Sequence, residues 1–127
     1  MNDLTREWIE KAEGDFATSG REIRARKQPN YDAACFHAQQ SAEKYLKAVL
    51  QENEVPIPRT HNLIDLLELC LPYDETLAFQ RDLLVVLDRY AVLYRYPGES
   101  ADKEEARRVY RTISSLRDFM RTRFDQI

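Results

Sequence analysis

The segment Tyr31–Leu50 reads YDAACFHAQQSAEKYLKAVL, and its apolar residues recur at the spacing of an α-helix. At 100° per residue these side chains share one broad face: Tyr31, Ala34, Cys35, Ala38, Ala42, Tyr45, Leu46 and Val49. The alanines on this face let a neighbouring helix approach closely. Asn30 can cap the first turn, and Pro29 disfavours helix before it. The segment therefore predicts the central helix of a helical bundle.

The sequence on either side of this segment carries the same periodicity. A first helix is expected from a cap at Asn2 or Asp3 to residues 26–28. The central helix is expected to stop near Asn53, because two prolines in the segment 55–59 favour an extended connector.

Three more helices are expected towards the C-terminus. Thr60 can cap a short helix over 61–71, Asp74 can cap a longer one that reaches Tyr94, and Ser100 can cap the last one. The longer helix has an apolar arc too wide for one buried side, which indicates a second buried side, as in a dimer. We predict an all-α, up-and-down helical bundle of four long helices plus one short helix, in a single domain over 1–127.

Composition limits the function classes. The chain has 127 residues, 43% of them hydrophobic and 32% charged, which is typical of a folded, soluble protein. Its net charge of −3 supplies no global basic field to attract nucleic acid. No apolar run approaches the roughly 20 residues of a membrane span, and the N-terminus does not resemble a signal peptide. We expect a cytoplasmic protein with no membrane partner.

Metal and cofactor motifs are missing from the sequence. The two histidines and two cysteines stand far apart, with no CxxC or HxxxH spacing, and there is no P-loop and no GxGxxG. We expect no metal and no cofactor. In a reducing compartment Cys35 and Cys70 are expected to be free thiols.

Two groups of residues are candidates for binding a nucleotide or another anion. His37, Ser41 and Lys44 share a face of the central helix, where they either donate to a phosphate or form a solvated surface. Arg59 and His61 flank a helix start, where free amides favour anions. The alternative for this second group is simple capping by Thr60 and cover by His61.

The last helix also carries a basic stripe, formed by Arg107, Arg111, Arg117 and Arg121. Such a stripe can contact phosphates, but in an acidic protein a solvated face paired with nearby acids is the commoner arrangement.

Several short motifs occur in one order along the chain. They are Phe36–Lys44 (FHAQQSAEK) with Leu46–Ala48, preceded by Trp8, Ala12, Asp15 and Tyr31 and followed by Arg59–Leu63 and Arg95–Pro97. Together they resemble the HEPN domain family, and the resemblance covers nearly the whole chain. It implies a compact α-bundle, usually a homodimer, and often a minimal nucleotidyltransferase partner in a toxin–antitoxin pair.

Many members of that family are metal-independent ribonucleases with an R-x(4–6)-H motif near the end of the fourth helix, at the dimer interface. This sequence has Arg89, but Tyr94 stands where the histidine should be. Tyr96 lies where some members carry a tyrosine that the partner nucleotidylates. A tyrosine of ordinary pKa near 10 is a poor acid or base at neutral pH, so no catalytic residue is assigned.

Arg89, Arg95 and Tyr96 can still bind a nucleotide or RNA without cutting it; their alternative role is helix-end packing. The sequence therefore favours a non-catalytic, homodimeric HEPN-like module that binds a nucleotide, a nucleotidyltransferase partner, or both. The alternatives are a degenerate ribonuclease toxin acting on RNA and a helical interaction subunit without a ligand.

Overall fold

The computed structural model describes residues 1–125, and all regular structure in that range is helical. Three helices have 22 residues each and two have eight: α1 (Asp3–Arg24), α2 (Tyr31–Glu52), α3 (Leu63–Cys70), α4 (Arg81–Asp88) and α5 (Lys103–Phe124). Two short 3₁₀ helices flank α4, namely η1 (Glu75–Gln80) and η2 (Arg89–Ala91). The expected all-α bundle is confirmed.

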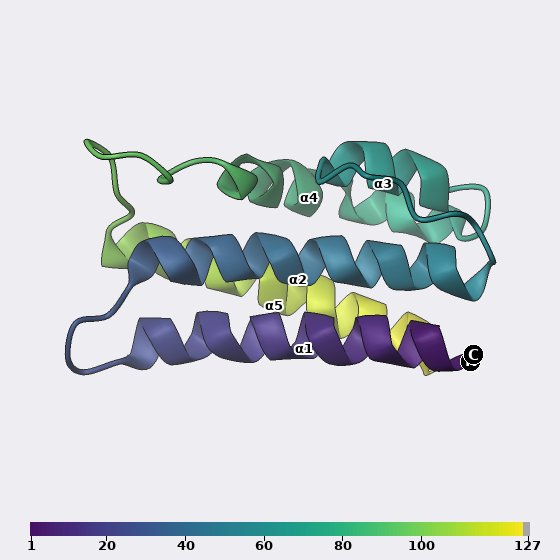
Figure 1. Cartoon of the computed structure of the whole chain (residues 1–127), viewed down its shortest axis with the longest axis horizontal. Helices are drawn as coiled ribbons and strands as arrows, with labels where there is room; N and C mark the ends of the chain where they lie inside the picture. Colours follow the sequence, from purple (N-terminus) through teal and green to yellow (C-terminus); the bar gives the residue numbers. More distant parts are fainter. Residues whose placement is uncertain (126–127) are drawn as a thin grey trace.

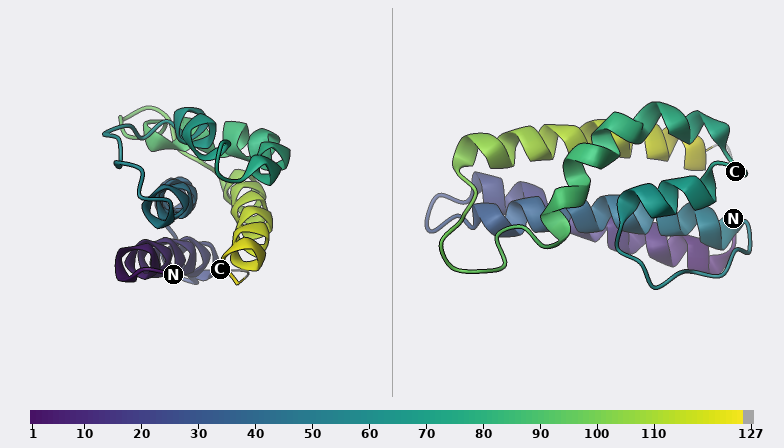
Figure 2. Two further views of the ribbon diagram at one scale, coloured as in Figure 1. Left: turned by 90° about the vertical axis from the view of Figure 1, so that its right-hand side faces the viewer. Right: turned by 90° about the horizontal axis from the view of Figure 1, so that it is seen from above.

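The three long helices run along the length of the molecule, and the shorter elements form a layer over them (Figure 1). Viewed end-on, α2 lies between this layer and α1, and α5 flanks it on one side (Figure 2). It contacts α1, α3, α4 and α5. This position explains why 13 of its 22 residues are buried, including the polar residues Gln39, Ser41, Glu43 and Lys47 beside the predicted apolar face.

Short polar side chains start the long helices. The Asn2 side chain accepts from Thr5 N at 2.8 Å, and the Asn30 side chain accepts from Ala33 N at 2.9 Å, both as expected. The first helix ends at Arg24, a few residues before the predicted stop, and Ala25 already has extended backbone.

Two predicted caps were wrong. Asn62, not Thr60, caps α3 by accepting from Ile64 N and Asp65 N, while Thr60 accepts from Asn62 N just outside the helix. Asp102, not Ser100, caps α5 by accepting from Glu105 N at 2.8 Å. In both places an Asn or Asp lies two residues beyond the expected cap and satisfies the free amides itself.

The expected fourth helix consists of three consecutive pieces, η1, α4 and η2. Its buried side chains Leu84, Leu87 and Tyr90 recur every three residues. Because a 3₁₀ helix has three residues per turn, the change to 3₁₀ geometry at Arg89 keeps Tyr90 directed at the core.

Both cysteines are free and buried among the helices. Burial raises the pKa of the Cys35 thiol and of the Cys70 thiol to about 12. Within residues 1–125, no helix combines the length and apolar composition of a membrane span.

Candidate functional site

Asp15 joins two of the predicted anion-binding residues to the fold. It lies on α1 with only 11% of its side chain exposed, and its two oxygens contact different residues of α2. His37 Nδ1 lies 2.8 Å from one oxygen, and Lys44 Nζ donates to the other. One turn from each, Ser41 Oγ donates to Ala12 O at 2.8 Å. The face that these three residues share therefore packs on α1.

Glu43 forms a second buried polar contact, between α2 and the connector that precedes α3. Its side chain is 4% exposed and accepts from Lys47 Nζ at 3.0 Å. The ring Nδ1 of His61 lies 3.0 Å from its other oxygen, and Gln39 Nε2 donates to His61 O at 3.1 Å. His61 thus anchors the connector, although 72% of its side chain is exposed.

Arg59 lies apart from both groups. It is exposed, and it has no hydrogen-bond or ion-pair partner in the part of the chain that is described. The structure thus brings His37 and Lys44 together through Asp15, places His61 on a different carboxylate, and leaves Arg59 in solvent.

The segment after α4 is held to α5 by two tyrosines. Tyr90 and Tyr94 each donate a hydroxyl hydrogen bond to the Glu105 carboxylate, at 2.8 and 2.6 Å. Tyr94 does so from a left-handed backbone with φ of 68°, a conformation that costs a non-glycine residue about 1 kcal/mol or more. The contact with Glu105 supports this costly conformation.

The Glu105 carboxylate and burial together raise the pKa of both hydroxyls. The hydrogen bond to Glu105 is the largest cause that raises the pKa of Tyr94, followed by burial. Burial is the largest cause for the raised pKa of Tyr90, followed by its bond to Glu105. Both side chains therefore stay protonated well above neutral pH.

Arg95 lies against the start of α2. Its guanidinium carbon is 5.8 Å from the centre of the Phe36 ring, and both residues line a shallow hollow of about 410 Å³. On the same side of the molecule, Asp32 accepts a hydrogen bond from Ala101 N at 2.6 Å. This bond fixes the end of the loop that joins η2 to α5. Tyr96 is 77% exposed.

The solvent-facing side of α4 and η2 carries three exposed valines and one arginine. Val85, Val86 and Val92 are 51%, 38% and 64% exposed, and Arg89 lies among them at helical spacing. Arg89 is also exposed, and its side chain has no hydrogen-bond or ion-pair partner among residues 1–125. We call these four residues the α4 surface.

Comparison with known proteins agrees with this architecture. The sequence matches the HEPN domain family over residues 5–123. This chain belongs to the HEPN domain family. The crystal structure of TT1696 from Thermus thermophilus is similar in fold, with a TM-score of 0.81 and 24% identity over 95% of this chain and 98% of that one. No curated protein matches the sequence.

Two of the three acidic residues that organise the site of this HEPN chain lie among the sequence motifs. Asp15 and Glu43 are motif residues, and the i, i+4 spacing of Glu43 and Lys47 already indicates their pair, whereas Glu105 was not singled out. Their partners lie 4 to 18 residues away for Glu43 and 11 to 15 for Glu105. The contact of Glu43 with His61 depends on the path of the connector before α3, and the pairing of Glu105 depends on how the 89–96 segment folds back, so neither is visible in the sequence.

Proposed function

We propose that this chain is a non-catalytic, homodimeric HEPN module that binds a nucleotide, a nucleotidyltransferase partner, or both. The observation that carries the proposal is the contact between Tyr94 and Glu105, at the position where the ribonuclease motif would have a histidine. A general acid or base works best with a pKa near the operating pH. The raised pKa of Tyr94 and its engaged hydroxyl make it unsuitable for either role.

The α4 surface supports a dimer. Three exposed valines in one area are unusual for a surface that faces only water, and Arg89 beside them is unpaired in the described part of the single chain. A second copy of the chain would cover the valines and bring Arg89 close to the partner's equivalent surface. This fits the second buried side that the apolar arc of this region indicates.

The residues available for a ligand in this proposal are the exposed ones. His37, Lys44 and His61 already contact carboxylates, so their side chains are less available to donate hydrogen bonds to a bound anion. Arg59, Arg89 and Arg95 retain donors for a phosphate group. Tyr96 is exposed enough for its hydroxyl to meet a nucleotidyltransferase, which makes it our candidate for modification in a toxin–antitoxin pair.

An RNA cleavage assay tests the absence of catalysis. Wild type and Arg89→Ala, purified in parallel, are expected to leave RNA equally intact. Cleavage by wild type that is lost in Arg89→Ala would overturn the proposal in favour of a ribonuclease. Cleavage that is equal in both preparations would point to contamination, and the assay would be repeated with repurified protein until wild type either loses the activity or proves dependent on Arg89.

Sedimentation and thermal unfolding test the other two parts. Val92→Asp is expected to convert a dimer to a monomer, whereas Leu4→Asp, a change at a comparably exposed residue of α1, should not.

A nucleotide at 100 times its Kd should stabilise the folded chain by about 2.7 kcal/mol. That effect should fall in Arg95→Gln. A monomeric wild type, or the absence of both a nucleotide effect and a copurifying nucleotidyltransferase, would contradict this part.

A further inference from the structure

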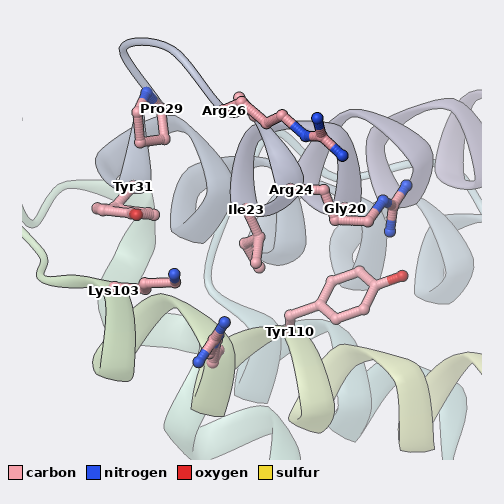
Figure 3. A pocket seen from close by; sticks show the side chains of 10 residues that line it. Gly20, Ile23, Arg24, Arg26, Pro29, Tyr31, Lys103 and Tyr110 are labelled. Atoms are coloured by element: carbon pink, nitrogen blue, oxygen red, sulfur yellow. The ribbon is translucent and has the colours of Figure 1, made fainter.

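A second hollow lies at the end of the molecule where α1 ends and α5 begins. It has a volume of about 640 Å³, within the range of small-molecule sites, and Figure 3 shows the side chains around it. Four of its lining residues are cationic: Arg24, Arg26, Lys103 and Arg107. None is acidic. This concentration of positive charge runs against the net charge of −3 of the whole chain.

The side chains of these four cations have no hydrogen-bond or ion-pair partner among the described residues. The acids at the start of α5 are engaged elsewhere. Asp102 caps the helix, Glu104 contacts Arg108 at 3.2 Å, and Glu105 accepts from the two tyrosines of the 89–96 segment. The cations around the hollow therefore form no ion pair within the described part of the protein, and the first amides of α5 also favour a bound anion.

Gly20 and two tyrosines shape the hollow. A Cβ atom at Gly20 would lie 2.9 Å from Arg24 Nη1 and 3.1 Å from the Tyr110 hydroxyl. Glycine inside a helix costs about 1 kcal/mol relative to alanine, so its presence here leaves room for those two side-chain ends. The Tyr110 ring is held by stacking on Phe16, with 5.1 Å between ring centres. Tyr31 supplies a second aromatic side chain on the other side (Figure 3).

We propose that this hollow binds a small compound with several phosphate groups. Guanidinium groups donate two parallel hydrogen bonds to phosphate oxygens, and four cations match the roughly three to four negative charges of a triphosphate. The tyrosine hydroxyls are further donors, and their rings can pack on an organic moiety. The site goes beyond the function proposed above and shares no lining residue with the hollow beside Phe36 and Arg95.

Calorimetric titration of the full chain tests this site, with tripolyphosphate, ATP and adenosine as separate probes at fixed ionic strength. Tripolyphosphate and ATP should bind, and adenosine should not. Arg107→Gln should weaken binding about tenfold or more, because it removes a charged donor. Arg111→Gln, which changes another exposed arginine one turn along α5 and outside the hollow, should change the affinity less than about twofold.

The two phosphate probes distinguish the source of affinity. Equal affinity for tripolyphosphate and ATP, lost in Arg107→Gln, supports recognition of the phosphates alone. Tighter binding of ATP, also lost in Arg107→Gln, supports recognition of phosphates with packing on a tyrosine. No binding of either probe, or equal weakening by Arg107→Gln and Arg111→Gln, would overturn the proposal.

Backbone chemical shifts separate this proposal from the function proposed above. Tripolyphosphate should move the amide signals of Gly20 and Tyr110. If it moves those of Arg95 and Tyr96 instead, the phosphate site lies at the other hollow; the proposal made here then fails while the proposed nucleotide site stands. Circular dichroism of Arg107→Gln should match wild type, since Arg107 has no partner in the described chain whose loss would disturb the fold.

Discussion

The two halves of α5 use their basic residues differently. In the C-terminal half, Arg117 and Arg121 contact Glu13 on α1 at 2.6 and 3.8 Å, and Arg123 donates to Asp74 at 2.7 Å. In the N-terminal half, Lys103 and Arg107 border a hollow without any partner in the described chain.

This contrast shows that a basic stripe on a helix has no single role. Where α1 presents an acid to α5, the arginines join two helices. Where α1 ends and presents cations of its own, the positive charge remains available. The contact of Asp15 with His37 and Lys44 belongs to the first class, because it joins α1 to α2.

The largest expected effect at neutral pH is at Asp15. Asp15→Asn leaves Lys44 partly buried beside an uncharged amide, so we expect a loss of about 3 kcal/mol in the free energy of unfolding. Urea denaturation measures this loss. Asp118→Asn, an exposed change on α5 with no side-chain partner in the described chain, should cost less than about 0.5 kcal/mol. Equal, small losses in both variants would show that Asp15 does not hold the helices together.

A separate effect, confined to alkaline pH, is the pH dependence that the two buried thiols impose on the free energy of unfolding. Cys35 lies near Glu105 and Asp32, Cys70 near Asp74, and burial is the largest cause that raises the pKa of each from near 9 to about 12. The folded chain keeps both thiols protonated where the unfolded chain ionises them. Stability is therefore full below about pH 9 and falls by about 1.4 kcal/mol per pH unit per thiol towards about pH 12.

Removal of one thiol should make this decline shallower. Unfolding of Cys70→Ala, measured by urea at several alkaline pH values, should lose the contribution of that group to the slope, whatever its stability at neutral pH. An unchanged slope would mean that Cys70 ionises alike in the folded and unfolded chains.

The smallest effect tests the contrast within α5 directly. Arg117→Gln removes the hydrogen bond to Glu13 and the contact with the Phe16 ring, 4.5 Å from the guanidinium carbon, so we expect a loss of about 1 to 2 kcal/mol. Arg107→Gln should stay within about 0.5 kcal/mol of wild type. Thermal or urea unfolding of the two variants in parallel measures both; losses of equal size would remove the distinction between the two halves.

The sequence was sufficient to predict the bundle because helical periodicity depends on neighbours three and four residues apart. The resemblance to the HEPN family also predicts that Tyr94 stands where many members have a histidine. The sequence was not sufficient to predict which charged side chains pair with each other. In the sequence, Arg107 and Arg117 are equivalent members of one basic stripe. Only the packing of α1 against α5 places Glu13 beside Arg117 and not beside Arg107.

The hollow was missed for a related reason. Its cations come from two segments about 80 residues apart, and only Arg107 belonged to a pattern visible in the sequence. Arg24 and Arg26 lie near the end of α1, where basic residues are common for a different reason, since they compensate the helix dipole. Their convergence with Lys103 depends on the packing of α1 beside α5.

The most direct test of the contrast follows the arginine side-chain Nε–H signals of the full chain by NMR, before and after addition of tripolyphosphate. Arg107 and Arg24 should exchange rapidly with water and shift on addition, whereas Arg117 should be protected and should not move. The account would be contradicted if, before addition, the Nε–H of Arg107 were as protected from exchange with water as that of Arg117. Equal shifts at both residues after addition would contradict it as well.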